Sequence, residues 1–480
     1  MTQKVTAGFQ PAKPLAFFEE ISAIPRASRH EERIAAYLCD FAAERGLECH
    51  SDGANNVYIV KSATPGMEDK APVALQGHID MVCEKNNDCD HDFDTQGLDL
   101  YVENGCLRAR GTTLGADDGA AVAIMMALLD SKDIPHPRLE CVFTSDEEMG
   151  MGGAKNFNFK QLTSRRMINL DSEEEGIVTV SCAGGVRSHL CYEFERVPVK
   201  GKLLRITIGG LAGGHSGADI HTGRNNAAKL LGAILCDLYS EQPLNILSVT
   251  SGSKDNAIPR EAEAVIATID PEKATERILS HDKKIRARLC KADKGFKLRV
   301  NKGKDVFGGM LTLRDTSRII SALVLCHNGI RSMSNKVEGL VEASSNLGIV
   351  ATSEAKIDLT VLSRSCDDNI VDEMIQVFDR LAKQTEASVE HTDRYPGWAY
   401  TGSSPLCDDY CRIYREMTGK EAKVMAIHAG LECGLIKHEL PDLDVISIGP
   451  DMTDIHTPAE SMDLASFERT YNLVLELLKA

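Results

Sequence analysis

Apolar and polar residues follow two periods along the first part of the chain, that of a helix and that of a strand. The segment SRHEERIAAYLCDFAAERG places Ile34, Leu38 and Phe41 on one helical face, and Ser28 and Glu31 have the spacing of a capping box before it. Apolar strands are predicted in NNVYIV, PVALQGHIDMV, LECVFTSDEE and RMINLDSEEE, with the apolar helix DDGAAVAIMMALLD between the second and the third. This alternation predicts an α/β domain with a largely parallel sheet covered by helices on both faces.

The pattern changes after Val186 and changes back after Pro396. Between these points, strands such as KLLRITIGG, EAEAVIATID and EAKIDLTVLSR are interleaved with two long helices, near residues 225–240 and 315–328. The sequence therefore predicts one α/β domain interrupted by an inserted α+β domain. The expected segments are the first part of the α/β domain, the insert, and the second part: residues 1–186, 187–396 and 397–480.

Two segments of the insert resemble each other. Residues 256–270 and 346–364 both run from an Asn, through a turn with a Glu-Ala pair, into an alternating strand. Either the insert contains two similar α+β halves, or the likeness is a chance one.

Composition limits the kinds of partner and compartment. The 54 basic and 71 acidic side chains give a net charge of −17, which argues against a nucleic-acid or anionic-membrane partner because phosphates would be repelled. The longest apolar run, residues 120–129, is about half the length of a membrane span, and the N-terminal segment has no apolar signal core. The fifteen cysteines include no CxxC pair, so neither a disulfide framework nor a thiolate zinc site is indicated. A reducing cytoplasm is the simplest location.

His78 and Asp80 stand two residues apart at the end of a predicted strand, so their side chains share a face. A ligating histidine needs an acceptor for its second ring nitrogen, and Asp80 can provide one. The alternative is a buried histidine satisfied by an aspartate, which is the commoner case when the HxD pattern is considered alone.

Other strand ends and helix starts also carry an acid or a histidine. Of Asp117 and Asp118 in GADDGA, one can cap the following helix while the other faces a site. Glu147 and Glu148 follow an apolar strand and, as neighbours in an extended chain, point to opposite sides. Two further residues complete the set. Asp171 ends another predicted strand, and His456 lies in the loop behind the last apolar strand.

The set lies just past the carboxyl ends of apolar strands, the edge at which α/β sheets bind ligands. Two imidazoles and three carboxylates without a thiolate suit a pair of zinc or similar divalent ions, bridged by one carboxylate. The acidic residues 173–175, which follow soon after Asp171, are interpreted instead as a solvated charge run.

The motifs GHIDMV, GADDGA, DEEMG, NLDSEEEG and DIHTPAE resemble those of the co-catalytic zinc aminoacylase, carboxypeptidase and dipeptidase family, and more closely its branch of aminoacyl-histidine (Xaa-His) dipeptidases. The resemblance extends over nearly the whole chain and includes AGGHSGADIHTGRNNA and AIHAGLECG. It implies that Asp80 orients His78 and that Glu147 is the general base, although the sequence alone does not choose between Glu147 and Glu148. The resemblance also implies the metal ligands. His78 and Asp171 would bind one ion, Glu148 and His456 would bind the other, and Asp117 would bridge the two.

The same resemblance implies substrate-binding groups. His215 in GGHSG would stabilise the oxyanion, and Asn256 and Arg364 would hold the substrate, with a guanidinium suited to a carboxylate. Glu432 in HAGLECG is a candidate for binding the substrate amine or imidazole. Without the resemblance, His215 would be an incidental residue of a Gly-rich turn and Arg364 a surface ion-pair partner. Because most of these groups lie in the insert, the insert is expected to close over the metals as a lid.

The leading expectation is a cytoplasmic metallodipeptidase, a homodimer by analogy. It would hydrolyse dipeptides with C-terminal histidine, carnosine-like ones among them, through a metal-bridged hydroxide with Glu147 as the base. The ions are expected to be zinc, although manganese and cobalt accept the same ligands. One alternative keeps the metals and changes the substrate: a tripeptide aminopeptidase or an N-acyl amino acid deacylase. An alternative of another class is a non-catalytic metal- or peptide-binding relative, against which the presence of a base argues.

Overall fold

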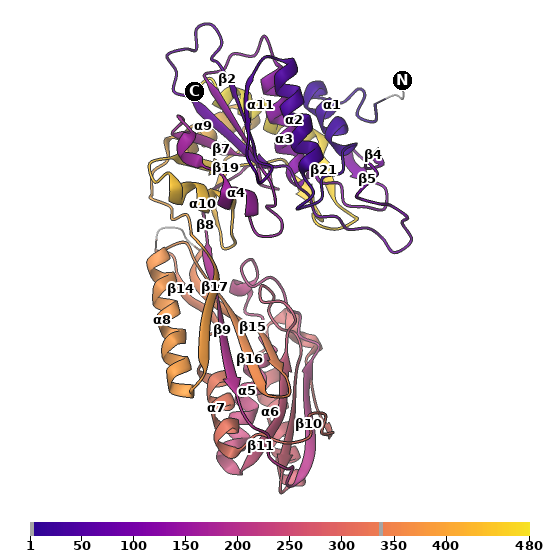
Figure 1. Ribbon diagram of the computed structural model, residues 1–480, viewed down its shortest axis with the longest axis vertical. Coiled ribbons are helices and arrows are strands. Elements are labelled where there is room, and N and C mark those ends of the chain that lie inside the picture. Colours follow the sequence, from indigo (N-terminus) through magenta and orange to yellow (C-terminus); the bar gives the residue numbers. More distant parts are fainter. Residues whose placement is uncertain (1–3, 336–338) are drawn as a thin grey trace. The chain divides into compact units, whose positions relative to one another are not determined.

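A computed structural model describes residues 4–335 and 339–480, which form two compact units (Figure 1). The chain passes from one unit to the other after Ser181 and returns at Tyr400, where the sequence pattern indicated changes after residues 186 and 396. We call these bodies unit 1, which is the chain up to Ser181 with Tyr400–Ala426 and Leu431–Ala480, and unit 2, which is Cys182–Ala399 with Ile427–Gly430.

Unit 1 is built on a sheet with a parallel centre. Among the described residues its strands follow the order β1 (Glu48–Ser51), β2 (Val57–Lys61), β6 (Leu139–Thr144), β3 (Val73–His78), β7 (Arg166–Asn169), β19 (Asp444–Ser447), β8 (Ile177–Cys182), β18 (Lys423–Ile427). Strand β3 pairs in parallel with β6 and β7, and β7 pairs in parallel with β19. Strands β1, β2 and β8 pair antiparallel with their neighbours. The expected α/β sheet is confirmed, with its parallel pairing confined to the centre.

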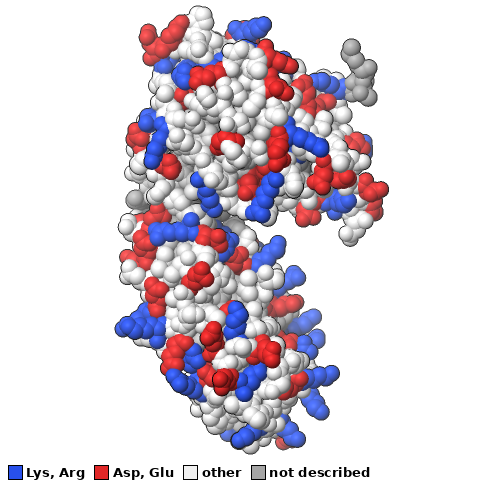
Figure 2. All heavy atoms as spheres, viewed as in Figure 1, with Lys and Arg blue, Asp and Glu red and all other residues white. Residues whose placement is uncertain are grey.

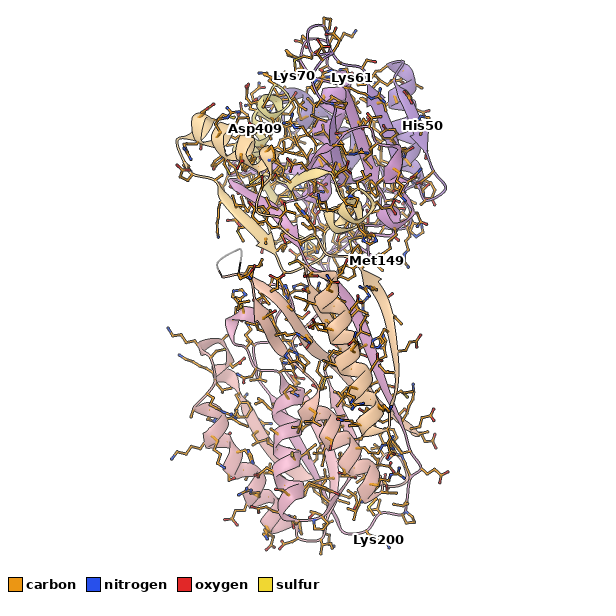
Figure 3. The ribbon with its side chains drawn as sticks, turned by 90° about the vertical axis from the view of Figure 1, so that its left-hand side faces the viewer. His50, Lys61, Lys70, Met149, Lys200 and Asp409 are labelled. Carbon is orange, nitrogen blue, oxygen red and sulfur yellow. The ribbon has the colours of Figure 1, made fainter. Side chains whose placement is uncertain are left out.

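Helices surround this sheet, and one of them is almost wholly buried. The helices of unit 1 are α1 (Ala12–Ser22), α2 (Glu32–Glu44), α3 (Ala116–Asp130), α4 (Gly152–Asn156), α9 (Pro405–Thr418), α10 (Glu432–Glu439) and α11 (Leu464–Leu477). Helix α3 packs on β3 and α1 and is buried from its first residue to Leu129, because its side chains are apolar on every face. Lys61, labelled in Figure 3, donates to the carbonyls of Leu128 and Ser131, which places a cation at the negative end of this helix.

The predicted capping box before α2 is wrong. The N-cap residue is Glu31, and its side chain makes no capping hydrogen bond. Glu31 Oε1 instead accepts from the backbone nitrogens of Arg29 and Asp146, and Ser28 Oγ donates to Asp80 at 2.7 Å. The two side chains are therefore committed to the loops at the end of the sheet, which leaves none for the helix start.

Unit 2 contains a second sheet, in which neighbouring strands run antiparallel. Its order within the described residues is β13 (Lys297–Lys302), β10 (Lys202–Gly209), β12 (Ala262–Thr268), β11 (Leu244–Ser251), β15 (Val341–Thr352), β16 (Lys356–Ser365), β9 (Gly184–Glu193), β17 (Ser388–Tyr395), with β14 (Gly329–Met333) beside β15. Four helices share its main core: α5 (Ala227–Glu241), α6 (Pro271–Arg286), α7 (Leu313–Leu325) and α8 (Asp368–Thr385). Two of them, α6 and α8, were not predicted; α6 is strongly polar and buries only Ala274, Ile278 and Ile285.

The strand order of unit 2 occurs twice. In the succession β10, α5, β11, β12, α6, β13, the strands lie side by side as fourth, first, third, second. The succession β9, α7, β15, β16, α8, β17 gives the same spatial order, and the first set is inserted between β9 and α7 of the second. The two segments that resemble each other in sequence contain β12 and β16, the third strand of each set. Of the two alternatives that the sequence left open, this strand order favours two similar α+β halves over a chance likeness.

Charged side chains are spread over the surface. On the face shown in Figure 2, basic and acidic residues are intermixed over both units and do not separate into one patch of each sign. Within the part of the chain that the structure describes, no helix is long and apolar enough to cross a membrane.

Candidate metal centre

The predicted metal ligands come together at one end of the sheet of unit 1. Because β3, β6 and β7 are parallel, the residues that end or follow them lie at the same edge. A second, four-stranded sheet, β20 (Met452–Thr453), β21 (Ser461–Asp463), β5 (Cys106–Ala109) and β4 (Leu100–Glu103), supplies a further loop. The contributions are His78 from β3, Glu147 and Glu148 behind β6, Asp171 behind β7, Asp117 at the start of α3, and His456 between β20 and β21.

Asp117 lies between two imidazoles. Its Oδ1 is 3.0 Å from His78 Nε2, and its Oδ2 is 3.0 Å from His456 Nε2. Burial favours the neutral carboxyl, but the hydrogen bonds to His456 and His78 outweigh it and lower the pKa of Asp117. The contacts with Asp117 and then Glu148 raise the pKa of His456 to about 10. A carboxylate with one imidazole at each oxygen has the arrangement required of a ligand shared by two cations.

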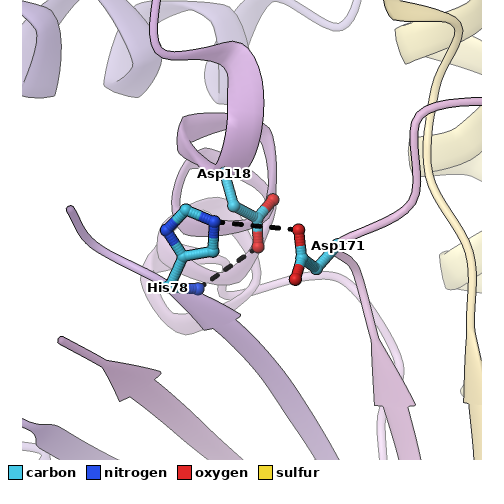
Figure 4. A group of neighbouring side chains, drawn as sticks. All are labelled: His78, Asp118 and Asp171. Carbon is cyan, nitrogen blue, oxygen red and sulfur yellow. Dashed lines mark hydrogen bonds and ion pairs between the residues drawn. The ribbon is translucent and has the colours of Figure 1, made fainter. Parts of the chain in front are cut away.

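Each of the two imidazoles has a further carboxylate beside it. His456 Nε2 is 3.0 Å from Glu148 Oε1. His78 Nε2 is 3.7 Å from Asp171 Oδ1, the pair joined by a dashed line in Figure 4. Two imidazole-carboxylate pairs therefore flank the shared Asp117.

Asp118 has a different environment from its neighbour. Its Oδ2 accepts from the backbone nitrogen of His78 at 3.2 Å (Figure 4), and its Oδ1 accepts from Ala121 N at 3.3 Å. Because Asp117 and Asp118 have non-helical backbone angles, the Asp118 side chain caps the regular part of α3 that follows them, and it fastens the end of β3 to this helix. The sequence did not decide which of the two aspartates caps the helix and which faces the site. In the structure Asp118 caps the helix and Asp117 faces the imidazoles.

Asp80 joins His78 to the loop that carries the two glutamates. Its Oδ1 lies 3.4 Å from His78 Nδ1, and it accepts from the backbone nitrogen of Glu147 at 3.1 Å. Its Oδ2 accepts from the backbone nitrogen of Glu148 at 3.3 Å. A carboxylate at the second ring nitrogen fixes the tautomer and orientation of a ligating imidazole.

Glu147 is half-buried next to the other carboxylates. Burial raises its pKa well above the ordinary value, the nearby Glu432, Glu148 and Asp117 add to the effect, and His78 opposes it. A carboxylate with an increased proton affinity is suited to accept a proton and to pass it on. Met149, the next residue but one, is 60% exposed and labelled at the surface of unit 1 in Figure 3.

The donor set fits a pair of divalent ions. Three groups of ligand atoms in the described residues have all their atoms within 4.8 Å of one another: His78, Asp118 and Asp171; His78, Glu147 and Glu148; Asp117, Glu148 and His456. Imidazole nitrogens and carboxylate oxygens suit zinc and other divalent transition ions. So many carboxylates in a largely buried place also require positive charge nearby.

Two of the residues predicted to bind substrate, His215 and Arg364, lie in unit 2. Arg364 is 6% exposed and donates from Nη1 to the Tyr395 hydroxyl at 2.8 Å, and the positive charge of Arg364 acts on His215. Burial, and then Arg364, lower the pKa of His215. His428, which the sequence analysis did not single out as a site residue, bonds Ser344 Oγ at 2.7 Å, and burial together with the charge of Arg364 lowers its pKa to about 3.

Asn256 and Glu432 differ in their surroundings. The Asn256 side chain is exposed, and its backbone carbonyl accepts from Ser216. Glu432 is fully buried at the start of α10, where Oε2 accepts from Gln76 Nε2 at 2.6 Å and from Thr144 Oγ1 at 2.7 Å. Burial raises its pKa to about 7. Its second oxygen makes no hydrogen bond within the described chain, so this atom alone is left for another partner.

One prediction about the acidic run after Asp171 is wrong. Glu175 is not solvated: its side chain is 10% exposed and forms a two-point ion pair with Arg469 on α11, with N–O distances of 2.8 and 2.6 Å. Glu173 and Glu174 are exposed, as predicted for the whole run.

Several polar residues that support the site were missed in the sequence. They are buried or half-buried and bond to the ligand-bearing segments: Arg26, Ser28, Gln76, Thr144 and Glu460. Only Glu460, four residues after His456 in DIHTPAE, stood within a motif. Ser28 was assigned to a helix cap instead, and the other three occur in segments that show no distinctive spacing.

A parallel-centred α/β sheet with clustered imidazoles and carboxylates at its edge, interrupted by a large insert, defines a metal-dependent hydrolase. The chain belongs to peptidase family M20/M25/M40, whose pattern matches residues 74–480.

Comparison with individual proteins gives the same result. Over 467 residues the chain is 37% identical to the cytosol non-specific dipeptidase of Escherichia coli K12, with 96% of each chain covered. The crystal structure of aminoacylhistidine dipeptidase from Vibrio alginolyticus matches with a TM-score of 0.91 at 36% identity, covering 100% of this chain and 98% of that one. Aminopeptidase PepT from Bacillus cereus matches with a TM-score of 0.57 at 16% identity over 98% of both chains, a likeness of fold alone.

Proposed function

We propose that this protein is a metallodipeptidase that hydrolyses the peptide bond of dipeptides and prefers those with C-terminal histidine, carnosine-like dipeptides among them. The observation that carries the proposal is the position of Asp117 between His78 and His456, with Glu147 beside them. The nearly complete coverage of two proteins named as dipeptidases supports the substrate class.

The proposed ligand set distributes the side chains over two ions, most simply zinc. One ion is assigned His78 and Asp171, the other ion is assigned Glu148 and His456, and Asp117 is shared by both. When bound, such ions polarise a carbonyl and make water acidic enough to attack it near neutral pH.

Glu147 is the proposed general base. It accepts the proton of the attacking water at its carboxylate, and then delivers a proton to the amine nitrogen that leaves. Asp80 supports this step from two sides, since it orients His78 and accepts from the backbone nitrogen of Glu147. The base is thereby held by the same carboxylate that positions a ligand.

Unit 2, which corresponds closely to the expected lid over residues 187–396, is proposed to bind the substrate. His215 donates to the oxyanion, and Asn256 and Arg364 hold the substrate, with the guanidinium on its free carboxylate. Arg364 has a buried Nε without a hydrogen bond in the described chain, which supports a role as anion donor. Glu432 is proposed to bind the substrate amine or imidazole, and its bonds to Gln76 and Thr144 hold it in place.

The location and assembly follow by analogy. We propose a cytosolic protein, in keeping with the name of the Escherichia coli relative, and a homodimer. Light scattering on the purified protein should give twice the chain mass of 52.3 kDa; a value equal to the chain mass would overturn the dimer. Metal analysis of protein purified without added metal distinguishes zinc from manganese or cobalt.

The substrate is tested with three matched compounds: an aminoacyl-histidine dipeptide, the tripeptide extended by one residue, and N-acetyl-histidine. We expect the dipeptide to be cleaved with the highest kcat/KM. Cleavage of the tripeptide alone would favour an aminopeptidase, and cleavage of the acetyl compound alone would favour a deacylase. Binding of the dipeptide without turnover would indicate a non-catalytic relative.

A further inference from the structure

Glu460 is a buried carboxylate whose partners are backbone nitrogens. It is 2% exposed. Oε2 accepts from Leu114 N at 2.8 Å and Gly115 N at 3.0 Å, and Oε1 accepts from Ala116 N at 2.8 Å and Asp117 N at 3.4 Å. One side chain therefore satisfies the successive donors of the turn that ends at Asp117. Glu460 also closes the β20–β21 loop that carries the other imidazole ligand.

Arg26 binds the same turn as a hydrogen-bond donor, whereas Glu460 is an acceptor. It is 2% exposed, and its Nη2 donates to the carbonyl oxygen of Gly115 at 2.5 Å. Its Nη1 donates to the carbonyls of Ile79 at 3.1 Å and Asp80 at 3.0 Å, directly behind β3. Burial lowers the pKa of Arg26, and the negative charge of Glu460 is the largest effect that opposes burial. Arg26 therefore binds the turn at a carbonyl oxygen, while Glu460 binds it at backbone nitrogens.

The guanidinium packs closely against two glycines. A Cβ on Gly115 would lie 2.6 Å from Arg26 Nη2, and a Cβ on Gly119 would lie 2.8 Å from the same atom. Gly115 also has a φ of 64°, in the left-handed region that favours glycine. The turn is therefore fixed by its backbone conformation, by its contact with Arg26, and by its bonds to Glu460.

We infer that Arg26 and Glu460 are positioning residues that hold three ligand-bearing segments in register: the end of β3 with His78, the turn with Asp117, and the loop with His456. The inference rests on the proposed metal centre. Neither side chain is a ligand, and both are almost inaccessible, so their effect is exerted through the backbone. Their role is to keep the two oxygens of Asp117 directed at two different imidazoles.

The physical reason is the requirement for satisfied buried donors. If Glu460 loses a carboxylate oxygen, at least one buried N–H of the turn loses its acceptor, and an unsatisfied buried donor is costly. The turn would then move toward another acceptor, and Asp117 would move with it. Residues behind the ligands of metal sites typically change metal affinity about 10- to 100-fold when replaced.

The test compares Glu460→Gln and Arg26→Lys with a matched control, Glu140→Gln. Glu140 is also fully buried in unit 1 and also accepts from backbone nitrogens, those of Thr163 and Ser164, but it lies near the start of β6, away from the ligands. Metal-free protein is titrated with Zn²⁺ against a chelating indicator. The Co²⁺ form is examined by visible absorption, which reports ligand geometry. Unfolding of the metal-free proteins by denaturant measures stability separately.

We expect both site variants to bind at least one of the two ions about 10- to 100-fold more weakly and to give an altered Co²⁺ spectrum. Glu140→Gln should lose stability only, with unchanged affinity and spectrum. Wild-type affinity and spectrum in both site variants would overturn the inference, as would the same loss of affinity in the control. If Glu460→Gln does not fold, Arg26→Lys decides the outcome alone. Since no substrate enters these measurements, failure to hydrolyse dipeptides would refute the proposed function and leave the inference intact.

Discussion

Asp80 shows how much of the site depends on a residue that is not itself a ligand. Its carboxylate contacts the ring of His78, the backbone of Glu147 and Glu148, and the hydroxyl of Ser28. Burial opposes its ionisation, but the bonds from His78 and Ser28 keep the pKa of Asp80 below its ordinary value. It is therefore charged at neutral pH, and this one carboxylate binds several segments that must stay together.

Ser28→Ala should weaken this arrangement without removing it. The change deletes the 2.7 Å bond to Asp80 Oδ2, and a hydrogen bond to a charged group is worth about 1.5–3 kcal/mol. We expect kcat/KM on a dipeptide to fall about 10-fold, measured at saturating metal.

A second serine provides the control for that variant. Ser164 is fully buried in unit 1, and its hydroxyl donates to the carbonyls of Pro72 and Arg166, away from the ligands. Ser164→Ala should lower the free energy of unfolding by about 1 kcal/mol and leave kcat/KM unchanged. Equal kinetic losses in both variants would show that the Ser28 effect is a general one on stability.

At the scale of elements, the site depends on the contact between β3 and α3. Gly77, the residue before His78, lies so close to α3 that a Cβ there would be 2.4 Å from Ala121 Cβ and 2.4 Å from Asp118 Oδ2. Only glycine permits this approach, which brings the end of the strand to the cap of the helix.

Gly77→Ala should therefore both destabilise unit 1 and disturb the site. Overpacking of this kind costs about 1–3 kcal/mol, and Asp118 cannot retreat without releasing the backbone of His78. Denaturant unfolding of the metal-free protein measures the first effect and zinc titration the second. The control is Gly53→Ala, because a Cβ on Gly53 meets nothing within 4 Å. A Gly77 variant as stable as the Gly53 variant would refute the argument.

The sequence predicted an element correctly where the periodicity and composition of the segment itself determine its structure. Apolar strands and the helix α3 were recognised because their periods and composition admit few alternatives, and the parallel order put their ends at one edge. The capping box failed because Ser28 bonds Asp80 and Glu31 bonds the backbone of Asp146 as well as that of Arg29, and both Asp80 and Asp146 are distant in sequence. Arg26 was missed for the same reason: its carbonyl acceptor at Gly115 is 89 positions away, and nothing local indicates it. Glu175 was misread because its partner lies on the last helix.

At the scale of the whole molecule, an α/β unit carries the proposed chemistry and an inserted unit carries its own duplicated sheet and core. This repeat could be seen faintly in the sequence because the third strand of each half follows a similar turn. The sequence analysis found no likeness in the rest of each half, since a half-buried strand needs only its alternation of apolar and polar residues. The strand order, in contrast, is the same in both halves, apart from β14, which has no counterpart in the first.

Removal of metal should act mainly on unit 1. The proposed ligands include several carboxylates in a partly buried place, and their mutual repulsion is no longer balanced when the ions leave. A ligand at 100 times its Kd stabilises a folded protein by about 2.7 kcal/mol. Chelation should therefore abolish hydrolysis and lower the Tm of the calorimetric transition of unit 1. The unfolding of unit 2, followed by the fluorescence of Trp398, the single tryptophan of the chain, should shift less. A larger shift at Trp398 would contradict this assignment.

The most direct test of the central claim is the comparison of wild type with Glu147→Gln in the same metal-loaded preparation. Turnover of an aminoacyl-histidine dipeptide and metal content are measured on each sample. We expect two equivalents of metal in both proteins, and a kcat lower by about 10²- to 10⁴-fold in the variant, the range for loss of a general base. A variant with its metal and near-normal turnover would contradict the assignment of Glu147, and a metal-loaded wild type that leaves the dipeptide intact would contradict the dipeptidase itself.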